Sequence, residues 1–197
     1  MKDVLITKRQ ALWLGRFQPP SIGHVVALLA LLAYWEKLTI GIVHRFNKKF
    51  EARKTWQDYL AKVSDVTDSV EKNPFTPDEI LEMWTETIKH LKLTHRVTFV
   101  SMARVAFQPD FNKDFPIETY DLVDMALHLT DPTHDHLRRD TFERILNRPI
   151  AYVYTPWKMH VSEMRERIRS DKLSWSDCLP PGGYESFIRM NGPERMR

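Results

Sequence analysis

The chain opens with apolar runs whose lengths alternate between those typical of strands and of helices. Residues 11–14 form a short apolar run that ends at Gly15, and two prolines follow at positions 19–20. Apolar residues then recur at helical spacing over 23–35, and a further apolar run occupies 38–43. This order predicts a strand, a turn, a helix and a second strand. The short connection favours parallel pairing of the two strands, as in the first unit of an α/β sheet.

Strands and helices continue to alternate over the rest of the chain. Thr76 is a predicted N-cap, because Pro77 and Glu79 follow it at helical positions that suit a helix start, and this helix runs to about Leu91. The other predicted elements are strands at 96–102, 120–123 and 149–154, a helix at 135–146, a charged helix at 162–170 capped by Ser162, and one short helix after the break at 180–183. The segment 46–72 is charged and irregular, so we expect a long connection that contains a helix.

The alternation predicts the fold class and the place of a ligand. It is typical of an α/β protein with a doubly wound parallel sheet, here with a short helical C-terminal extension. Ligands of such sheets bind at the carboxyl ends of the strands. A length of 197 residues fits a single domain over residues 1–197.

Composition narrows the class of protein without choosing a function. Apolar residues make up 43% of the chain, which excludes global disorder. Cys178 is the single cysteine, so no disulfide can form within the chain and a reducing, cytoplasmic location is expected. The most apolar stretch, 25–35, is too short to cross a bilayer, and residues 1–10 lack the core of a signal peptide. The net charge of +3 is mild and by itself says little about nucleic acid, because a basic site for phosphates would produce it equally well. We expect neither a nucleic-acid nor a membrane partner. A homo-oligomer is compatible with the sequence.

The first turn carries the most specific chemistry. Gly15 and Gly23 permit close approach of the backbone to a ligand. The helix that begins near Gly23 presents free amide groups and a positive dipole end, which favour an anion, and Arg16 and His24 add donors beside it. The alternative is that Gly15 and Pro20 only shape a tight turn, with His24 an ordinary residue at a helix start.

The same turn resembles a known motif. Residues 15–24 read Gly-Arg-Phe-Gln-Pro-Pro-Ser-Ile-Gly-His, which is similar to the Gly-Arg-Phe-Gln-Pro-Phe-His-x-Gly-His motif of the nicotinamide mononucleotide (NMN) adenylyltransferases, especially the archaeal type. The chain differs at two positions. Pro20 stands where Phe is usual, and Ser21 stands where the first His of the motif is usual.

Further segments resemble the same family in the same order along the chain. Asn-Pro-Phe-Thr at 73–76, followed by Glu79, resembles the family's Asn-Pro-Phe-Thr-x-x-Glu helix start. Pro-Asp-Phe-Asn at 109–112 resembles its Pro-Asp-Ile-Asn segment, and 162–165 resembles the end of its Ile-Ser-x-Thr-x-Ile-Arg motif. Asn-Gly-Pro-Glu-Arg at 191–195 resembles its Asn-Gly-x-Glu-Arg tail. The resemblance therefore covers nearly the whole chain.

The resemblance implies a Rossmann-like nucleotidyltransferase fold and a reaction. The enzyme would transfer a nucleoside monophosphate from a triphosphate, with ATP favoured and CTP allowed, to a phosphate-bearing acceptor, and would release pyrophosphate. NMN is the favoured acceptor, which would make the product NAD. Since a phosphate nucleophile is already anionic, the reaction needs positioning and charge neutralisation rather than a general base. Mg²⁺ would bridge triphosphate oxygens, mostly through water, without a set of protein ligands.

The resemblance also assigns candidate residues to each half of the site. The candidate catalytic residues are His24, Arg165 and Arg16. The candidate nucleotide-binding residues are Gly15, Arg16, Phe17, Ser21, Gly23, His24, Ser162 and Arg165. The candidate acceptor-binding residues are Asp110, Asn112, Trp56 and Arg53. For Arg165 the alternative is that it belongs to the solvated face of a highly charged helix.

Ser21 is the departure with the clearest chemical consequence. A serine hydroxyl donates one hydrogen bond but carries no charge. Loss of one transition-state donor costs about a hundredfold or more in rate. Three outcomes stay open: Ser21 acts together with a neighbour, the enzyme is slow, or the chain binds nucleotide without turnover.

Two other departures fall where the acceptor should bind. An aromatic, basic segment at 45–56 stands in place of the family's phosphate loop between the second strand and Asn73. The family's tryptophan-led helix after Pro-Asp-Ile-Asn is shortened or absent, because Lys-Asp-Phe-Pro occupies 113–116. A different phosphorylated or phosphonate acceptor is therefore the alternative to NMN.

Overall fold

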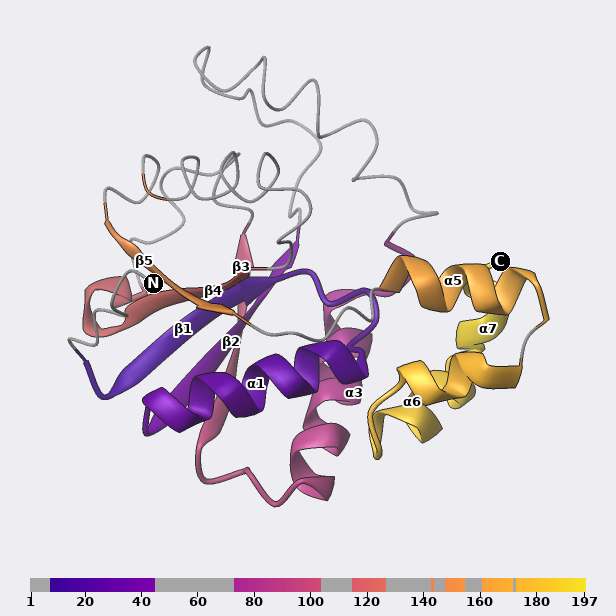
Figure 1. Cartoon of the computed structure of the whole chain (residues 1–197), viewed down its shortest axis with the longest axis horizontal. Helices are drawn as coiled ribbons and strands as arrows, with labels where there is room; N and C mark the ends of the chain where they lie inside the picture. The colour runs from indigo at the N-terminus through magenta and orange to yellow at the C-terminus, as the bar shows by residue number, and fades with distance from the viewer. Residues whose placement is uncertain are drawn as a thin grey trace, which may run out of the picture. The chain divides into compact units, whose positions relative to one another are not determined.

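Figure 1 shows the computed structural model of the chain, coloured by residue number. The chain divides into two compact units, each treated separately below. The described residues are 8–44, 73–103, 115–126, 143, 148–154, 161–171 and 173–197. The first, here called the sheet unit, comprises Met1–Gly15, Val26–Phe50 and Arg96–Lys158. The second, here called the helical unit, comprises Arg16–Val25, Glu51–His95 and Met159–Arg197.

The sheet unit contains a five-stranded sheet whose strands are all parallel. The strands are β1 (Gln10–Gly15), β2 (Lys37–His44), β3 (Val97–Ala103), β4 (Asp121–Ala126) and β5 (Ile150–Tyr154). Their order is β3-β2-β1-β4-β5, the order of one classic doubly wound fold. The predicted α/β class and all five predicted strands are confirmed.

From β1 the chain adds β2 and β3 on one side of the sheet and then β4 and β5 on the other side. The switch point of the sheet, where this direction changes, therefore lies at β1. β1 pairs with β2 through Gly15 and Ile42, and with β4 through Trp13 and Val123. In open α/β sheets a ligand binds outside the carboxyl ends of the strands at this point. Gly15 is the last residue of β1, so the turn that resembles the nucleotide motif leaves the sheet at its switch point.

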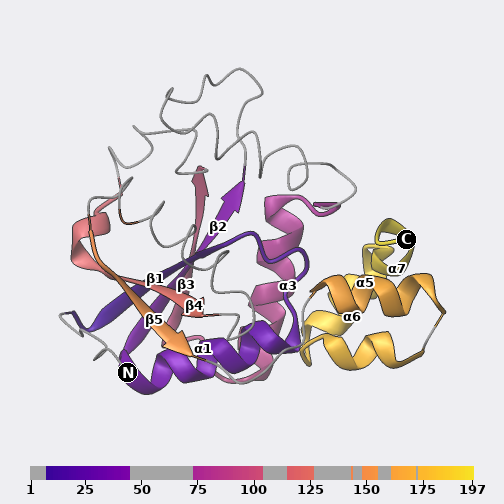
Figure 2. The ribbon, with the colours of Figure 1, turned by 45° about the horizontal axis from the view of Figure 1, so that its top comes forward.

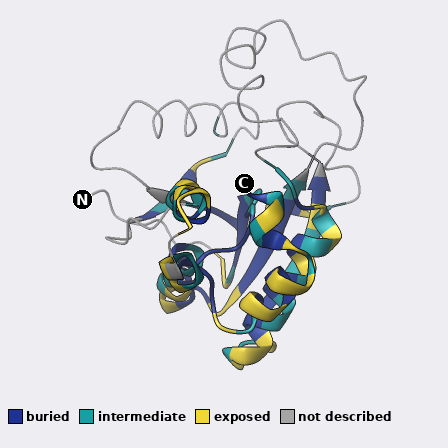
Figure 3. Ribbon diagram, turned by 90° about the vertical axis from the view of Figure 1, so that its right-hand side faces the viewer, coloured by how far each residue is buried: buried dark blue, intermediate teal, exposed yellow. Residues whose placement is uncertain are grey.

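The strands form a continuous apolar core (Figure 3). Leu12, Leu14, Met102 and Leu122 belong to one buried cluster. Gly41 packs closely there, because a Cβ at this position would lie 2.5 Å from Leu14 Cδ2 and 2.9 Å from Met102 Sδ and would force these side chains to shift. A strand buried on both sides reads as an apolar run rather than an alternation, which is why the sequence identified β1 and β2 so readily.

Two polar side chains in the sheet unit, the buried Asp121 and the half-buried Arg96, bind partners far away in the sequence. Asp121 begins β4 and accepts hydrogen bonds from Trp35 Nε1 and from the backbone N–H of Lys8, both at 2.9 Å. The Arg96 guanidinium donates to the carbonyls of Leu32 and Trp35 at 2.7 and 2.8 Å. These bonds satisfy carbonyl groups at the C-terminal end of α1 (Ile22–Tyr34), where cations are favoured.

Helix α3 (Pro77–His90) of the helical unit begins as predicted. The Thr76 side chain accepts from the Glu79 backbone, and the Glu79 carboxylate accepts from the Thr76 backbone, which completes a capping box. Its buried residues include Ile80, Met83 and Trp84, so the helix presents one apolar face.

The C-terminal extension consists of several short helices (Figure 2). These are α5 (Val161–Arg169), the 3₁₀ helix η3 (Leu173–Cys178), α6 (Gly183–Arg189) and α7 (Gly192–Arg195). Two predictions need correction here. Ser162 is not the N-cap of α5, because Val161 is already helical. The chain after the 180–183 break forms two helices rather than one, because Asn191 adopts a left-handed conformation (φ 54°) that ends the first.

The predicted helix at 135–146 and the connection at 46–72 lie outside the described residues, apart from the single residue Glu143. Before β4 the described chain forms a short 3₁₀ helix, η2 (Ile117–Thr119). Within the described ranges, no helix is both long and apolar enough to span a membrane.

Candidate active site

The turn between β1 and α1 has an unusual backbone. Phe17 has a φ of 50°, in the left-handed region that residues other than glycine rarely adopt, and the Gln18–Pro19 peptide bond is cis. A left-handed conformation at a residue with a side chain, as at Phe17, costs conformational energy and persists only where its surroundings hold it in place. The neighbours of this turn therefore decide whether it is a fixed site.

Hydrogen bonds hold the turn to the start of α3. The Gln18 side-chain amide donates to the carbonyl of Phe75 at 2.8 Å and accepts from the backbone N–H of Phe75 at 3.0 Å. Arg16 Nη1 donates to Asn73 Oδ1 at 3.3 Å. The Asn-Pro-Phe segment therefore holds the nucleotide-like turn by its own backbone and side chains.

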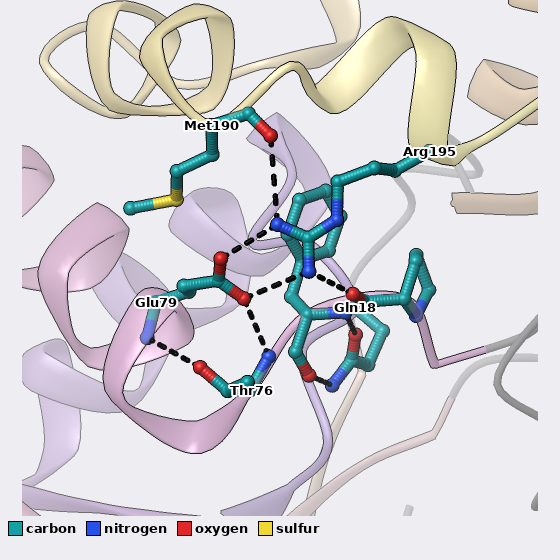
Figure 4. A network of polar contacts seen from close by, with 7 residues as sticks. Gln18, Thr76, Glu79, Met190 and Arg195 are labelled. Carbon is teal, nitrogen blue, oxygen red and sulfur yellow. Dashed lines mark hydrogen bonds and ion pairs between the residues drawn. The ribbon is translucent and has the colours of Figure 1, made fainter.

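The start of α3 is fixed in turn by Arg195 (Figure 4). Arg195 donates to the two carboxylate oxygens of Glu79 at 2.6 and 2.9 Å and also donates to the carbonyl of Pro74. Its guanidinium carbon lies 4.6 Å from the centre of the Phe75 ring. The hydrogen bond from Arg195 is the main reason that the pKa of Glu79 falls from 4.5 to about 2, although partial burial opposes the shift. Two segments that looked separate in the sequence form one scaffold behind the turn.

Ser21 and His24 meet at the first turn of α1. Ser21 precedes the helix, and its carbonyl accepts from the backbone N–H of Val25 at 3.2 Å, as an N-cap residue does. His24 Nδ1 accepts from the backbone N–H of Ser21 at 3.0 Å and lies 2.9 Å from Ser21 Oγ. The histidine ring is therefore tied to the helix start at its Nδ1 edge.

Aromatic rings hold the other sides of His24. The Phe17 and His24 rings meet edge to face with their centres 5.2 Å apart, and Trp84 lies 6.4 Å from His24 and 5.4 Å from Phe17. Trp13, Trp35 and Trp84 are buried. The sequence alone did not identify Trp84 as a contact of the candidate catalytic histidine. No local signal marks it, because it falls on the apolar stripe of α3 like its neighbours.

Arg165 is less exposed than two of the other charged residues of α5. Glu166 and Arg169 are exposed, whereas Arg165 is half-buried and follows the buried residue Met164. Ser162 is exposed in the first turn of the helix. Glu163 and Arg167 on the same helix are half-buried as well, so the functional role of Arg165 stays a prediction.

The remaining features to consider are the acceptor candidates, the single cysteine and possible metal ligands. The acceptor candidates Asp110, Asn112, Trp56 and Arg53 lie outside the described residues. Burial raises the pKa of the Cys178 thiol, which keeps it protonated and unreactive. Over the part of the chain that the structure describes, no group of three or more His, Cys, Asp or Glu side chains is placed to hold a metal ion.

The known proteins that this chain is similar to include nicotinamide-nucleotide adenylyltransferases. No family model matches the chain. It is 24% identical over 196 residues to a protein named nicotinamide-nucleotide adenylyltransferase from Pyrobaculum neutrophilum, covering 96% of this chain and 93% of that protein. It is also similar in structure to a bifunctional NMN adenylyltransferase/ADP-ribose pyrophosphatase from Francisella tularensis, solved with AMP and a manganese ion, with a TM-score of 0.63 at 15% identity.

The chain has the fold of the NMN adenylyltransferases. A second structure of the Francisella protein gives a TM-score of 0.61 at 16% identity. Each of these matches covers 96% of this chain, whereas the chain spans about half the length of each solved chain, 51% and 52%. The resemblance expected from the sequence motifs is confirmed. In this adenylyltransferase fold, the glycine-bounded turn follows β1 at the switch point of the sheet.

Proposed function

We propose that this chain transfers the adenylyl group of ATP to NMN, which yields NAD and pyrophosphate. A curated relative of almost the same length carries the name of this activity. The observation that carries the proposal is the structure of the turn: a left-handed Phe17, a Gln18 locked to the backbone of Phe75, and a His24 ring fixed at the start of α1. A turn that only connected a strand to a helix would need none of these constraints.

The reaction is one displacement at phosphorus. A phosphate oxygen of NMN attacks the α-phosphorus of ATP, the bond from that phosphorus to the β-phosphate oxygen breaks, and pyrophosphate leaves. Negative charge grows on the leaving group, so donors fixed before the reaction supply most of the stabilisation. We assign these donors to the first amides of α1 together with His24, Arg16 and Arg165, with Gly15, Phe17 and Gly23 shaping the turn and Ser162 contributing from α5.

Magnesium fits this site as a companion of the triphosphate. In the described part of the chain, no cluster of acidic or histidine side chains is arranged as a metal cage. Mg²⁺ keeps several waters and binds phosphate oxygens readily, so it can arrive with ATP without such a cage. A related structure contains a manganese ion, which supports use of a divalent cation. When bound, the ion would neutralise charge on the phosphates.

The test is direct measurement of kcat/KM for NMN with ATP and Mg²⁺, with CTP in place of ATP as the comparison. We expect a value of about ten thousand per molar per second or more, and at least tenfold preference for ATP. The same assay with a panel of other phosphorylated and phosphonate acceptors checks the acceptor.

A different acceptor is the second candidate, and one observation favours it. The sequence departs from the family pattern at 45–56 and at 113–116, both where the acceptor is expected. Pyrophosphate release with another acceptor, and no NAD, would select it. Tight ATP binding without pyrophosphate release from any acceptor would select a non-catalytic nucleotide-binding protein.

Several further expectations accompany this proposal and remain predictions. We propose that both units act as one nucleotidyltransferase domain, because the chain passes between them repeatedly along its sequence. We retain a cytoplasmic location, Asp110, Asn112, Trp56 and Arg53 as acceptor ligands, no nucleic-acid or membrane partner, and compatibility with a homo-oligomer.

A further inference from the structure

We infer that Ser21 is a positioning residue that sets the tautomer of His24, rather than a ligand of the triphosphate. This inference rests on the proposed function and deepens it, since it concerns the position where the family motif has its first histidine. Ser21 was expected to bind nucleotide through its hydroxyl. The hydrogen bonds at the start of α1 give that hydroxyl a different role.

The argument begins with the backbone of Ser21. Its N–H can only donate, and it points at His24 Nδ1 over 3.0 Å with hydrogen-bond geometry. Nδ1 must therefore accept, which requires that it carry no proton. A proton on Nδ1 would face the amide hydrogen of Ser21 directly.

The role of the hydroxyl follows from the state of Nδ1. Ser21 Oγ lies 2.9 Å from the same nitrogen. Since Nδ1 has no proton to give, the hydroxyl is the donor in this contact. A serine has a single O–H donor, and here the imidazole ring uses it. Ser21 is also only 1% exposed, so a phosphate oxygen would have to displace the ring to reach this hydroxyl.

The consequence falls on the opposite nitrogen of the ring. With Nδ1 held as an acceptor by two donors of Ser21, the ring proton resides on Nε2. His24 then presents an Nε2–H donor, and the rings of Phe17 and Trp84 at 5.2 and 6.4 Å restrict the direction in which it points. A ring free to exchange tautomers would present this donor only part of the time. Ser21 thus compensates for the missing histidine by improving the donor that remains.

The first test is a double-mutant cycle between Ser21→Ala and His24→Ala, measured as kcat and as KM for ATP in the presence of NMN. Loss of one hydrogen bond predicts that Ser21→Ala alone lowers kcat about tenfold, with KM for ATP changed less than twofold. In the His24→Ala background the same substitution should have no further effect, because a positioning residue acts only through its partner. An equal loss in both backgrounds would overturn the inference and make Ser21 a direct ligand.

Ser186→Ala is the matched control for loss of a buried hydroxyl. Ser186 is also 1% exposed, and it lies in α6, where its Oγ accepts from Arg189. We expect this variant to keep the parent kcat. If it lost as much kcat as Ser21→Ala, the effect of Ser21 would be one of general packing, and the inference would be wrong.

The second test needs no turnover. Nitrogen-15 NMR of the imidazole ring should show His24 with a bare Nδ1 and a protonated Nε2 in the protein without substrates. Ser21→Ala keeps the backbone donor at 3.0 Å, so the same tautomer should persist there, with the Nδ1 resonance shifted because the hydroxyl hydrogen bond is lost. A proton on Nδ1 in the parent protein would overturn the inference. If the parent makes no NAD, the proposed function fails separately, and the NMR measurement still confirms or overturns the inference.

Discussion

Arg195 and Glu79 lie 116 positions apart in the sequence and form a two-point ion pair, with nitrogen–oxygen distances of 2.6 and 2.9 Å. The same Glu79 carboxylate caps α3 through the backbone N–H of Thr76 at 2.7 Å. One carboxylate thus joins a helix start to the C-terminal helices. Because Phe75 beside it holds Gln18, the pair stabilises the segment that supports the nucleotide-like turn.

Glu79→Gln should therefore lower the free energy of unfolding in a pH-dependent way. The loss of a capping contact and of a partly buried ion pair predicts about 1–2 kcal/mol at pH 7. The pKa of Glu79 falls to about 2 in the folded state, so its contribution is complete above the ordinary carboxyl pKa and is lost as the pH falls from 4.5 toward 2. Urea unfolding of parent and variant between pH 7 and pH 3 measures the difference in their free energies of unfolding, which should become smaller as the pH falls.

The control for this prediction is Glu82→Gln. Glu82 lies on the same helix and pairs with Arg189, but this pair is exposed, so removing it should change stability by less than about 0.5 kcal/mol. Equal effects of the two substitutions, or a Glu79→Gln effect that did not vary with pH, would contradict the assigned role.

Gly192→Ala should destabilise the C-terminal helices through overpacking. A Cβ at this position would lie 2.4 Å from the Phe187 ring, which is buried and packs against Phe75 with ring centres 5.6 Å apart. We expect a cost of about 1–3 kcal/mol in thermal or urea unfolding. Phe187→Leu, added to Gly192→Ala, should cost less than the sum of the two single substitutions. Strictly additive losses would show that the ring is not the obstacle.

Two isosteric substitutions of His24 separate the roles of its two nitrogens. His24→Asn places an amide near the position of Nδ1 and removes the Nε2 donor, so turnover should fall at least about a hundredfold. His24→Gln places an amide N–H near the position of Nε2 and should retain more activity than His24→Asn. Steady-state assays on folded variants measure the turnover of each. Full activity in His24→Asn would show that His24 is not a catalytic residue.

Arg165→Lys should be strongly impaired, because lysine keeps the charge but loses the bidentate fork that suits phosphate. We expect kcat/KM to fall about tenfold or more, and Arg165→Ala to weaken ATP binding measured by calorimetry. Arg169→Lys is the control on the same helix, since Arg169 is exposed and donates to the carbonyl of Arg197 at 2.8 Å. Unchanged ATP affinity in Arg165→Ala would show that Arg165 is an ordinary surface residue of the helix with no role in ATP binding.

The sequence by itself determined the elements whose signals are local. The apolar run before Gly15 and the helical spacing after Gly23 specified β1 and α1, and the Thr76–Glu79 capping box specified the start of α3. The alternation of strands and helices also gave the parallel sheet, because each parallel connection requires a crossover. The nucleotide-like turn could be located for the same reason: its glycines, arginine and histidine are consecutive in the chain.

The tertiary structure alone decided which of these residues act together. Gln18 pairs with the backbone of Phe75, 57 positions away, and Arg195 reaches Glu79 across a far longer separation. Neither contact leaves a periodicity or a spacing that a sequence could display, because long-range contacts depend on how separate elements pack. The same holds for Trp84 against His24. The sequence left the role of Ser21 open. In the structure its hydroxyl and its amide both lie against one nitrogen of His24, which favours a role in positioning the ring. A single hydroxyl donor cannot serve the ring and a phosphate at once.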